Sequence, residues 1–359
     1  MKTKALVLLG IVALAFSGMD AAAASLREEM IAKAQKEKAL VLIGSLAEDI
    51  RTRLPGFQKR YPFIKIKDLD MNTKDSVNRV SLEAKAGRLS IDWSGISEDG
   101  AEIFVRQGLS ARHEFPHLKD FAPGFQPPHG LWTGVFANPR AQGAYNTDLL
   151  KPEDVPKTWE DMADPKFKGK TMLSRSAEDI PGRLAWLFRE KDGKWGWDRS
   201  FDLFTKLKAH NPSIARGNAG GMQRLAAGEV SIFWFSAVTP AALLAVNRKA
   251  PLGLIAFPKF FGGVRAWTIF KNAPHPASAW LLTDYVTSPE GQFEFTDRVQ
   301  GFIPLNRKAK PGRMAQWVAE RGGTLENLNV IDLTNLEEIY SDKNQERSEK
   351  FFFKLLGLR

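Results

Sequence analysis

Short apolar runs and amphipathic stretches alternate through residues 38–100. The runs have the length of strands, and one of them alternates apolar and polar positions. The stretches between them carry apolar residues at helical spacing, and a glycine follows the second. Three strand-then-helix units in a row predict a parallel sheet covered by helices. The predicted strands are 39–43, 64–67 and 89–93, the last running into a polar turn at 94–97, and the predicted helices are 47–60, 75–87 and 101–108.

A similar unit lies in residues 217–239. A loop leads into the helical stretch 221–227, a glycine ends that stretch, and the β-rich run 230–235 follows. Ligands of α/β proteins bind just beyond the carboxyl ends of strands, where backbone N–H groups are free. We therefore expect Ser236 and Thr239, which come directly after this run, to take part in binding.

The chain is expected to pass between two lobes. Residues 132–136 and 143–146 have the pattern of strands that change direction, and the strand 265–270 is expected to cross back. About 335 residues remain after the N-terminal segment, which is more than one compact core usually organises. The pattern therefore predicts a two-lobed α/β protein.

The first 24 residues have the pattern of a cleavable secretory signal peptide. Lys2 and Lys4 precede the apolar stretch 5–18, and four alanines at 21–24 offer a cleavage site. The apolar stretch is shorter than the ~20 residues of a membrane span, and an uncleaved anchor is the alternative. The chain has no cysteine, which excludes disulfides, thiolate metal sites and a lipid-modified cysteine. We expect a periplasmic protein without a lipid anchor.

The net charge favours small anionic partners. The formal charge is +10, and a basic surface attracts anions. The lysines and arginines are nevertheless dispersed along the chain, as on an ordinary soluble surface, which is the alternative interpretation. No nucleic-acid-binding module is recognisable, so we expect no nucleic-acid partner.

One motif suggests a different chemistry. His113, Glu114 and His117 form a literal H-E-x-x-H, which in zinc peptidases places two histidines one helical turn apart. Pro116 lies inside that turn and biases the residue before it away from helical geometry. We therefore expect no metal here, and a secreted zinc hydrolase is the alternative outside transport.

Several short motifs occur in the order found in one family. Together they resemble the extracellular solute-binding proteins of ABC importers, in the branch that serves ferric ion, phosphonates, sugar phosphates, thiamine and polyamines. The resemblance runs from about residue 38 to residue 310. The motifs are Ala144–Leu149 (AYNTDL), Pro165–Lys170 (PKFKGK), Ala227–Val230 (AGEV), Asn272–Pro276 (NAPHP), Ser288–Gln292 (SPEGQ) and Gly301–Pro304 (GFIP).

The resemblance implies a type 2 periplasmic-binding-protein fold. In such a fold two parallel-rich sheets with flanking helices are joined by two crossing strands and close on one solute. It also implies a monomer that catalyses nothing, needs no cofactor and delivers its solute to the membrane subunits of an ABC permease. The predicted domains are a signal peptide at 1–24, lobe 1 at 25–135 and 264–320, lobe 2 at 136–263, and a C-terminal helical segment at 321–359 that packs on the lobes.

Five further places could contact the solute. Ser45 and Ser97 follow first-lobe strands, where the family touches its ligands, although each could be a plain loop serine. Arg265 lies on the expected crossing strand, where its guanidinium could hold a carboxylate or phosphate by two hydrogen bonds, or lie on the surface. Arg175 and Ser176 lie in a turn before a predicted helix, whose N-terminus could bind the anion or be capped by the acids at 178 and 179. Asn218 in the central loop is the last candidate.

The solute is predicted to be anionic, with a phosphonate, organophosphate or carboxylate group. Ferric members of the family carry a tyrosine pair where this chain has Val238 and Thr239, and an acid near the place of Ser97. Because Fe³⁺ needs anionic oxygen ligands, bare iron is not expected. A ferric complex held through a synergistic anion or chelator is the alternative within the family, and a periplasmic sensor domain is an alternative without a transporter.

Overall fold

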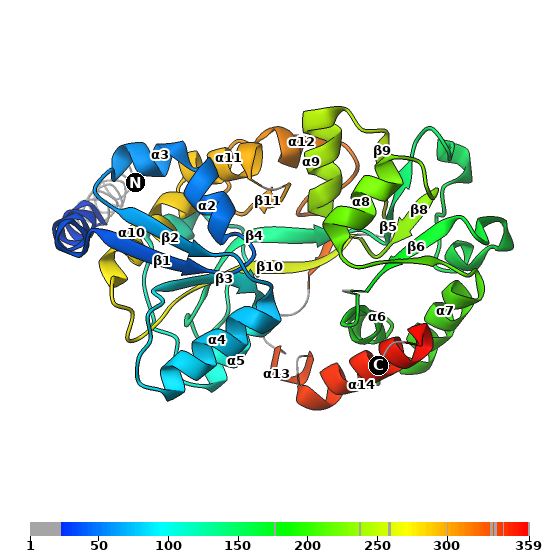
Figure 1. Cartoon of the computed structure of the whole chain (residues 1–359), viewed down its shortest axis with the longest axis horizontal. Coiled ribbons are helices and arrows are strands. Elements are labelled where there is room, and N and C mark those ends of the chain that lie inside the picture. Colours follow the sequence, from blue (N-terminus) through cyan, green and yellow to red (C-terminus); the bar gives the residue numbers. More distant parts are fainter. Residues whose placement is uncertain are drawn as a thin grey trace, which may run out of the picture.

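The computed structural model describes residues 23–175, 177–236, 238–257, 260–299, 301–330, 333, 336–339 and 341–357. Two sheets lie side by side with helices around each, and two long strands run between them (Figure 1). This is the two-lobed α/β architecture that the sequence predicts. The predicted signal peptide lies almost wholly outside the described residues. Within them, no helix combines the length and apolar character that a membrane span requires.

The first sheet has seven strands in the order β11-β4-β10-β3-β1-β2, and β12 pairs with β10 beside this path. β1 is parallel to β2 and β3, as the strand-then-helix pattern predicts, whereas β10 is antiparallel to β3 and β4. The strands are β1 (Ala39–Ile43), β2 (Lys65–Leu69), β3 (Trp93–Ser97), β4 (Thr133–Arg140), β10 (Phe260–Ile269), β11 (Ile303–Pro304) and β12 (Leu328–Val330).

The second sheet has five strands in the order β7-β6-β8-β5-β9. β6 is parallel to β7 and β8, and β5 is antiparallel to β8 and β9, so the sheet is mixed. The strands are β5 (Gly143–Asn146), β6 (Thr171–Ser174), β7 (Ser213–Ala215), β8 (Ile232–Trp234) and β9 (Leu252–Ile255).

Helices cover both sheets, and an unlabelled first helix spans residues 23–37. The others are α2 (Ala47–Arg53), α3 (Pro55–Arg60), α4 (Thr73–Lys85), α5 (Glu98–Arg106), α6 (Ile180–Leu187), α7 (Trp197–Ala209), α8 (Asn218–Ala226), α9 (Val238–Arg248), α10 (Pro276–Thr287), α11 (Pro289–Arg298), α12 (Arg313–Ala319), α13 (Leu336–Ile339) and α14 (Asp342–Leu356). Single 3₁₀ turns are η1 (Pro116–Asp120), η2 (Pro152–Asp154), η3 (Asp161–Ala163) and η4 (Pro165–Phe167).

The third strand of the first sheet does not lie where its apolar residues predict. Leu89–Trp93 was expected as the strand, but β3 is Trp93–Ser97, the stretch predicted as a polar turn. All five residues of β3 are buried, because the strand pairs with both β1 and β10. Sheet pairing therefore outweighs local β propensity here. As a result, Ser97 is the last residue of the strand and immediately precedes α5.

Two antiparallel strands form the crossing between the sheets. β4 pairs with β10 from Arg140 opposite Phe261 to Thr133 opposite Trp267. The chain enters the second sheet just after β4 and returns just before β10, and Figure 1 shows both strands passing between the sheets. The predicted lobe boundaries at 135/136 and 263/264 fall inside these two strands, and the domain division stays a prediction.

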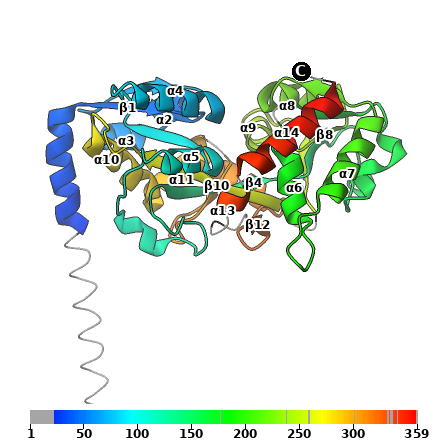
Figure 2. The same ribbon diagram turned by 90° about the horizontal axis from the view of Figure 1, so that it is seen from below.

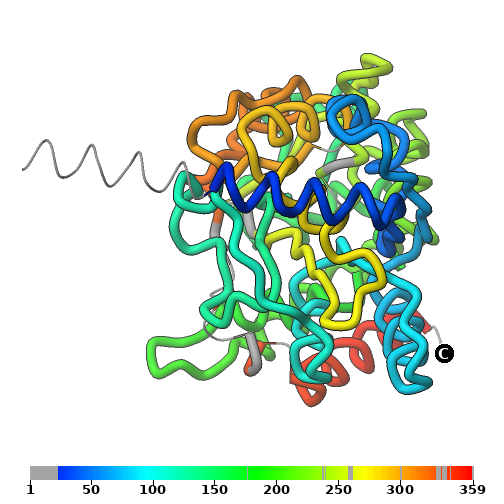
Figure 3. Tube along the Cα trace, turned by 90° about the vertical axis from the view of Figure 1, so that its left-hand side faces the viewer, coloured from blue at the N-terminus to red at the C-terminus, as the bar shows by residue number. Residues whose placement is uncertain are grey.

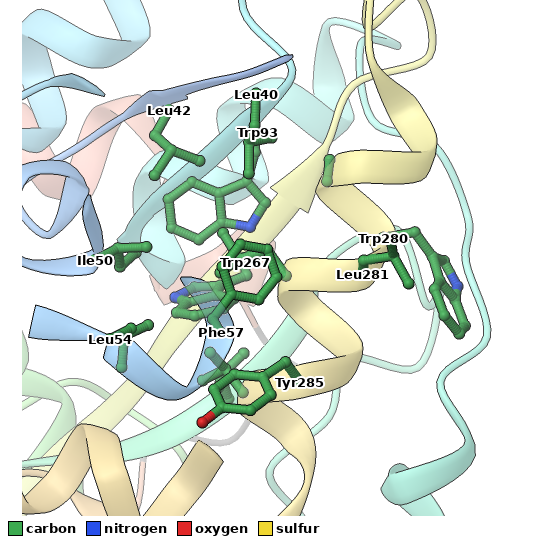
Figure 4. Close-up of a cluster of buried hydrophobic side chains, with 14 of the residues drawn as sticks. Leu40, Leu42, Ile50, Leu54, Phe57, Trp93, Trp267, Trp280, Leu281 and Tyr285 are labelled. Atoms are coloured by element: carbon green, nitrogen blue, oxygen red, sulfur yellow. The ribbon is translucent and has the colours of Figure 1, made fainter. Parts of the chain in front are cut away.

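A core of large aromatic residues holds the first sheet to its helices (Figure 4). The rings of Trp93 and Trp267, from neighbouring strands, meet edge to face at 4.6 Å between centroids. Phe57 and Tyr285 pack below them from α3 and α10. Each large apolar side chain buried in this way contributes about 1.5–3 kcal/mol to stability.

The first helix closes one side of this lobe (Figure 3). Leu26, Met30 and Ile31 pack against the aromatic core. The Glu37 carboxylate accepts hydrogen bonds from the backbone N–H groups of Ala277 and Ser278, at 3.0 and 2.8 Å. These N–H groups begin α10 and have no partner within the helix, so Glu37 acts as the cap of α10.

The C-terminal segment differs from the predicted helical segment, because it contains a strand. β12 pairs with β10 of the first sheet, and the chain then continues through α13 to α14. α13 contacts both α5 and α6, and α14 packs on α6 and α7, beside the second sheet (Figure 2). The segment therefore begins on one lobe and ends on the other.

Candidate functional site

Two helices from different lobes meet through one buried ion pair. α5 begins directly after β3 of the first sheet, and α6 follows β6 of the second sheet. Arg183 Nη1 of α6 donates to Glu98 Oε1 of α5 at 3.2 Å, and both side chains are almost wholly buried. Strand ends from both sheets therefore face the same place, where α/β folds bind ligands.

Arg183 is also held from its own helix. Its Nε donates to Asp179 Oδ2 at 2.6 Å, one turn earlier in α6. Burial alone would raise the pKa of Asp179, but the positive charges of Arg183 and Arg140 hold that pKa below its ordinary value. The carboxylate therefore stays ionised, and Arg183 lies between two acids from different lobes.

Arg265 is the second buried guanidinium of this region. It lies on β10 opposite Ser97 of β3, and its Nη2 donates to Ser45 Oγ at 2.8 Å and to the carbonyl of Gly95 at 3.3 Å. Its residue exposure is 8%, and its Nε carries no hydrogen bond within the described part of the chain. Burial lowers the pKa of Arg265 to about 10, so the group is still charged at neutral pH.

No carboxylate pairs with Arg265 among the described residues, whereas Arg183 has two. The acids Glu98 and Asp99 act on Arg265 only through longer-range attraction, and Arg140 opposes them. A buried cation without an acidic partner is costly, and the cost falls when an anion binds beside it. The unpaired charge is the most unusual feature of this region.

Asp99 adds a buried acid beside these groups. Its Oδ1 is buried and has no hydrogen-bond partner in the described part of the chain. Burial raises the pKa of Asp99, and the nearby charge of Glu98 raises it further, although Arg183 opposes both effects. Ser97 hydrogen bonds to Asp99. The distance from Ser97 Oγ to Thr73 Oγ1 is 3.0 Å. We call Glu98, Asp99, Arg140, Asp179, Arg183 and Arg265 the charge cluster.

A glycine makes room for the cluster. A side chain at position 263 would collide with the Glu98 carboxylate, so Glu98 lies directly against the backbone of β10. Gly263 and Arg265 are two residues apart on this strand and therefore face the same side of the sheet. The acid of the ion pair and the unpaired guanidinium thus share one face of a crossing strand.

The eight predicted binding residues fall into two groups. Ser45 and Arg265 are hydrogen bonded, and Ser97 is the strand partner of Arg265. The others lie along the second sheet: Arg175 is exposed in the turn after β6, Asn218 is half-buried at the start of α8, and Ser236 is buried after β8. Thr239 lies in the first turn of α9 with its side chain undescribed, and Ser176 lies outside the described residues. Contact of all eight with a solute stays a prediction.

Sequence reasoning missed Glu98, Asp99, Asp179 and Arg183 as candidates. The sequence indicates Asp179 only as a possible cap of the following helix, and it gives Arg183 no role. A partial signal exists, because Asp179 and Arg183 are four residues apart, the spacing at which opposite charges pair on a helix. The partner from the other lobe has no such signal, because Glu98 lies 85 positions away.

The H-E-x-x-H motif does not form the helix that zinc peptidases need. Phe115 has an extended backbone with φ −125° and ψ 124°, and His117 lies in η1. His117 Nε2 is 3.9 Å from Asp284 Oδ1, and His113 is half-buried beside aromatic residues. No group of three or more His, Cys, Asp or Glu side chains suited to a metal occurs within the described residues. The two histidines therefore lack the geometry for that chemistry.

The family model for bacterial extracellular solute-binding proteins matches residues 55–321, which is more than half of the chain. The chain belongs to this family. It is a family of transport binding proteins, not of enzymes, whose members bind a small solute and serve ABC permeases. The expected family and fold are therefore confirmed, and the solute is a separate question.

Individual relatives differ in what they bind. The chain is 24% identical over 246 residues to the Fe(3+)-binding periplasmic protein of Serratia marcescens, covering 62% of this chain and 70% of that protein. A solved structure of AfuA from Actinobacillus pleuropneumoniae, with fructose-6-phosphate bound, matches with a TM-score of 0.72 and 20% identity, over 89% of this chain and 99% of that one. Iron-bound HitA from Pseudomonas aeruginosa matches with a TM-score of 0.69 and 18% identity, over 88% and 99% of the chains. At such identities the solved structures establish the fold alone.

Proposed function

We propose that this protein is the periplasmic component of an ABC importer that captures a small anionic solute between its lobes. The solute carries a phosphate, phosphonate or carboxylate group, and Arg265 is the principal partner of that group. The observation that supports this is the buried Arg265 guanidinium, which has a free Nε and no acidic partner among the described residues.

Ser45 and Ser97 complete the expected contact. Ser45 already accepts a hydrogen bond from Arg265, so its own hydroxyl proton is available for an anion. Ser97 ends the neighbouring strand at the same level as Arg265. A guanidinium with two nearby hydroxyls offers charged hydrogen bonds to two or three oxygens of one anionic group.

The cluster also suggests how capture and closure are linked. Arg183 and Glu98 come from different lobes, and their ion pair exists only while α5 and α6 are close together. A solute whose anionic group contacts Arg265, with α6 opposite, would stabilise the closed form in preference to the open one. Ligand binding then shifts the population toward closure, which is the state a permease can recognise.

The test is a thermal-shift titration of the chain beginning at residue 25. The ligands are phosphonates, sugar phosphates, small carboxylates, polyamines and ferric citrate. At a hundredfold excess over Kd the expected stabilisation is about 2.7 kcal/mol, or a few degrees for a chain of this size. A thermal shift with one anionic class supports the proposal. If only polyamines give a shift, or if none of the anions does, the proposal is contradicted.

A ferric complex is the second candidate, because the Serratia marcescens relative is named for Fe(3+) binding. Val238 stands where ferric members have a tyrosine and is buried in an apolar cluster, so iron would need oxygens from a chelator. Ferric citrate and citrate alone therefore form a matched pair in the titration. Equal shifts assign the site to the anion, and a shift that needs iron assigns it to the complex.

A further inference from the structure

The first turn of α6 is held by a serine from the far end of the chain. Ser348 Oγ of α14 accepts a hydrogen bond from the backbone N–H of Gly182 at 2.9 Å and donates to the carbonyl of Glu178 at 2.7 Å. The first N–H groups of a helix have no partner within it, and Asp179, at the cap position, makes no side-chain cap hydrogen bond. Ser348, with a residue exposure of 1%, therefore supplies a cap from another helix.

This turn carries the residues that reach the opposite lobe. Gly182 immediately precedes Arg183, and Glu178 immediately precedes Asp179, so the two hydrogen bonds of Ser348 lie beside the two charged residues. Arg183 in turn donates to Glu98 of α5. The orientation of Arg183 therefore depends on a turn whose backbone Ser348 fixes at both ends.

α14 is itself firmly anchored on the second lobe. Phe351 stacks on Phe201 of α7 with 3.8 Å between ring centroids, and Phe352, which is fully buried, packs on Phe204. The Arg347 guanidinium lies 4.5 Å from the ring centre of Trp197. These contacts hold the helix on α7 through residues other than Ser348, so loss of the Ser348 hydroxyl leaves α14 in place.

The same segment reaches the first lobe before it reaches α14. β12 pairs with β10, α13 contacts α5 and α6, and Glu338 of α13 accepts a hydrogen bond from Trp195 Nε1 at 2.9 Å. Residues 322–357 also lie beyond the part of the chain that the family model matches, which ends at 321.

We propose that β12, α13 and α14 form a brace, in which Ser348 is a positioning residue for the solute site. It holds the first turn of α6 so that Arg183 faces Glu98 and the solute, and it thereby sets the affinity of the site for anions. This inference rests on the proposed function, because it assigns Ser348 a role in that same site. Ser348 itself touches no solute.

The test compares Ser348→Ala with Ser348→Thr, which keeps a hydroxyl, and with Ser288→Ala as a matched control. Ser288 is also a buried serine at a helix start, and its hydroxyl accepts from the backbone N–H of Gly291 at 3.1 Å and donates to the carbonyl of Tyr285 at 2.6 Å, at α11 of the first lobe. Hydrogen exchange of residues 178–184 is measured without solute, and Kd is measured for the anion that gives the largest thermal shift.

We expect Ser348→Ala to speed hydrogen exchange in the α6 turn by about tenfold. Binding of the anion should weaken by about fivefold to tenfold, as the loss of a buried hydrogen bond predicts. Ser288→Ala should change neither quantity, and Ser348→Thr should restore part of both. In an Arg183→Ala background, Ser348→Ala should leave Kd unchanged, because the residue through which it acts is absent.

Three outcomes separate this inference from the proposed function. If the wild-type protein binds no anion, the proposed function fails, and with it the role of Ser348 in affinity. If hydrogen exchange of residues 178–184 is also unchanged in Ser348→Ala, Ser348 does not position the turn. If the wild-type protein binds an anion and Ser348→Ala binds it equally well, the brace inference alone is wrong. Equal weakening by Ser348→Ala with and without Arg183 would also overturn it, because the effect would then be a general loss of stability.

Discussion

The carboxamide of Gln142 makes two hydrogen bonds to the backbone of Phe257. Its Nε2 donates to the Phe257 carbonyl at 2.7 Å, and its Oε1 accepts from the Phe257 N–H at 3.0 Å. Gln142 follows β4, Phe257 follows β9, and both are buried. One side chain therefore joins the outgoing and returning chain segments where they enter the second lobe.

Gln142→Leu should destabilise the protein strongly, because it leaves the N–H and carbonyl of Phe257 buried without partners. Each such group costs about 1–3 kcal/mol. Urea unfolding measures the change in free energy. Gln316→Leu is the control, because Gln316 of α12 is exposed and its side chain donates to the carbonyl of Pro311, just before that helix. If both variants lose a similar free energy of unfolding, the link that Gln142 makes between the two segments does not contribute to stability.

Arg265→Ala should weaken binding of the anionic solute by about 1.5–3 kcal/mol, the contribution of a charged hydrogen bond. Arg265→Lys keeps the charge but loses the planar fork, so it should recover only part of this loss. Isothermal titration calorimetry gives the affinities, and Arg248→Ala, an exposed arginine of α9, serves as the control. Unchanged affinity in Arg265→Ala would remove this residue from the site.

Glu98→Gln should strengthen anion binding by about fivefold, or roughly 1 kcal/mol, because it removes a like charge and a competitor for Arg183. Asp179 remains to hold Arg183, so the guanidinium keeps one acidic partner. Glu48→Gln, at an exposed position of α2, controls for the change in net charge. Weaker binding in Glu98→Gln would instead mean that the ion pair of Glu98 with Arg183 favours closure by more than its negative charge opposes the anion.

Asp99 should make the protein less stable as the pH rises through the elevated pKa of this residue. Burial raises that pKa above the ordinary value of 3.8, so between these two pH values the folded state binds more protons than the unfolded state. The stability that Asp99 contributes is therefore greatest below pH 3.8, and it is lost above the pKa that Asp99 has in the folded state. Asp99→Asn should consequently be more stable than the wild type at neutral pH.

Thermal unfolding of both proteins between pH 3.5 and 8 tests this sign, with the difference in melting temperature as the readout. Taking the difference removes the contribution of acids far from Asp99, and the charged groups that face Asp99 are Glu98, Asp179 and Arg183. A wild-type protein that is the more stable of the two at neutral pH would show that the Asp99 carboxylate has a cationic partner.

The sequence predicts the fold well where local pattern and tertiary pairing agree. Ala39–Ile43 is a strand in both the prediction and the structure, because the run is apolar and lies inside the sheet. β3 was predicted wrongly, because Ser94, Gly95 and Ser97 have no strand propensity and are extended only through their pairing with β1 and β10.

The candidate site divides in the same way. The sequence placed Ser45 and Arg265 at a strand end and on a crossing strand, and the structure joins them by a hydrogen bond. The pairing of Arg183 with Glu98 could not be predicted, because the two helices face each other only after the sheets are placed. The contact of Ser348 with Gly182, 166 positions apart, is beyond local pattern for the same reason.

The C-terminal crossing also limits how far the lobes can separate. β4 and β10 lie side by side, so by themselves they allow the lobes to rotate over a wide range of angles. A third connection between the end of β12 and the start of α14 consists of residues 331–341, which span at most roughly 36–40 Å even when fully extended. The lobes can therefore separate only as far as this peptide allows, as long as β12 stays paired with β10 and α14 stays on α7.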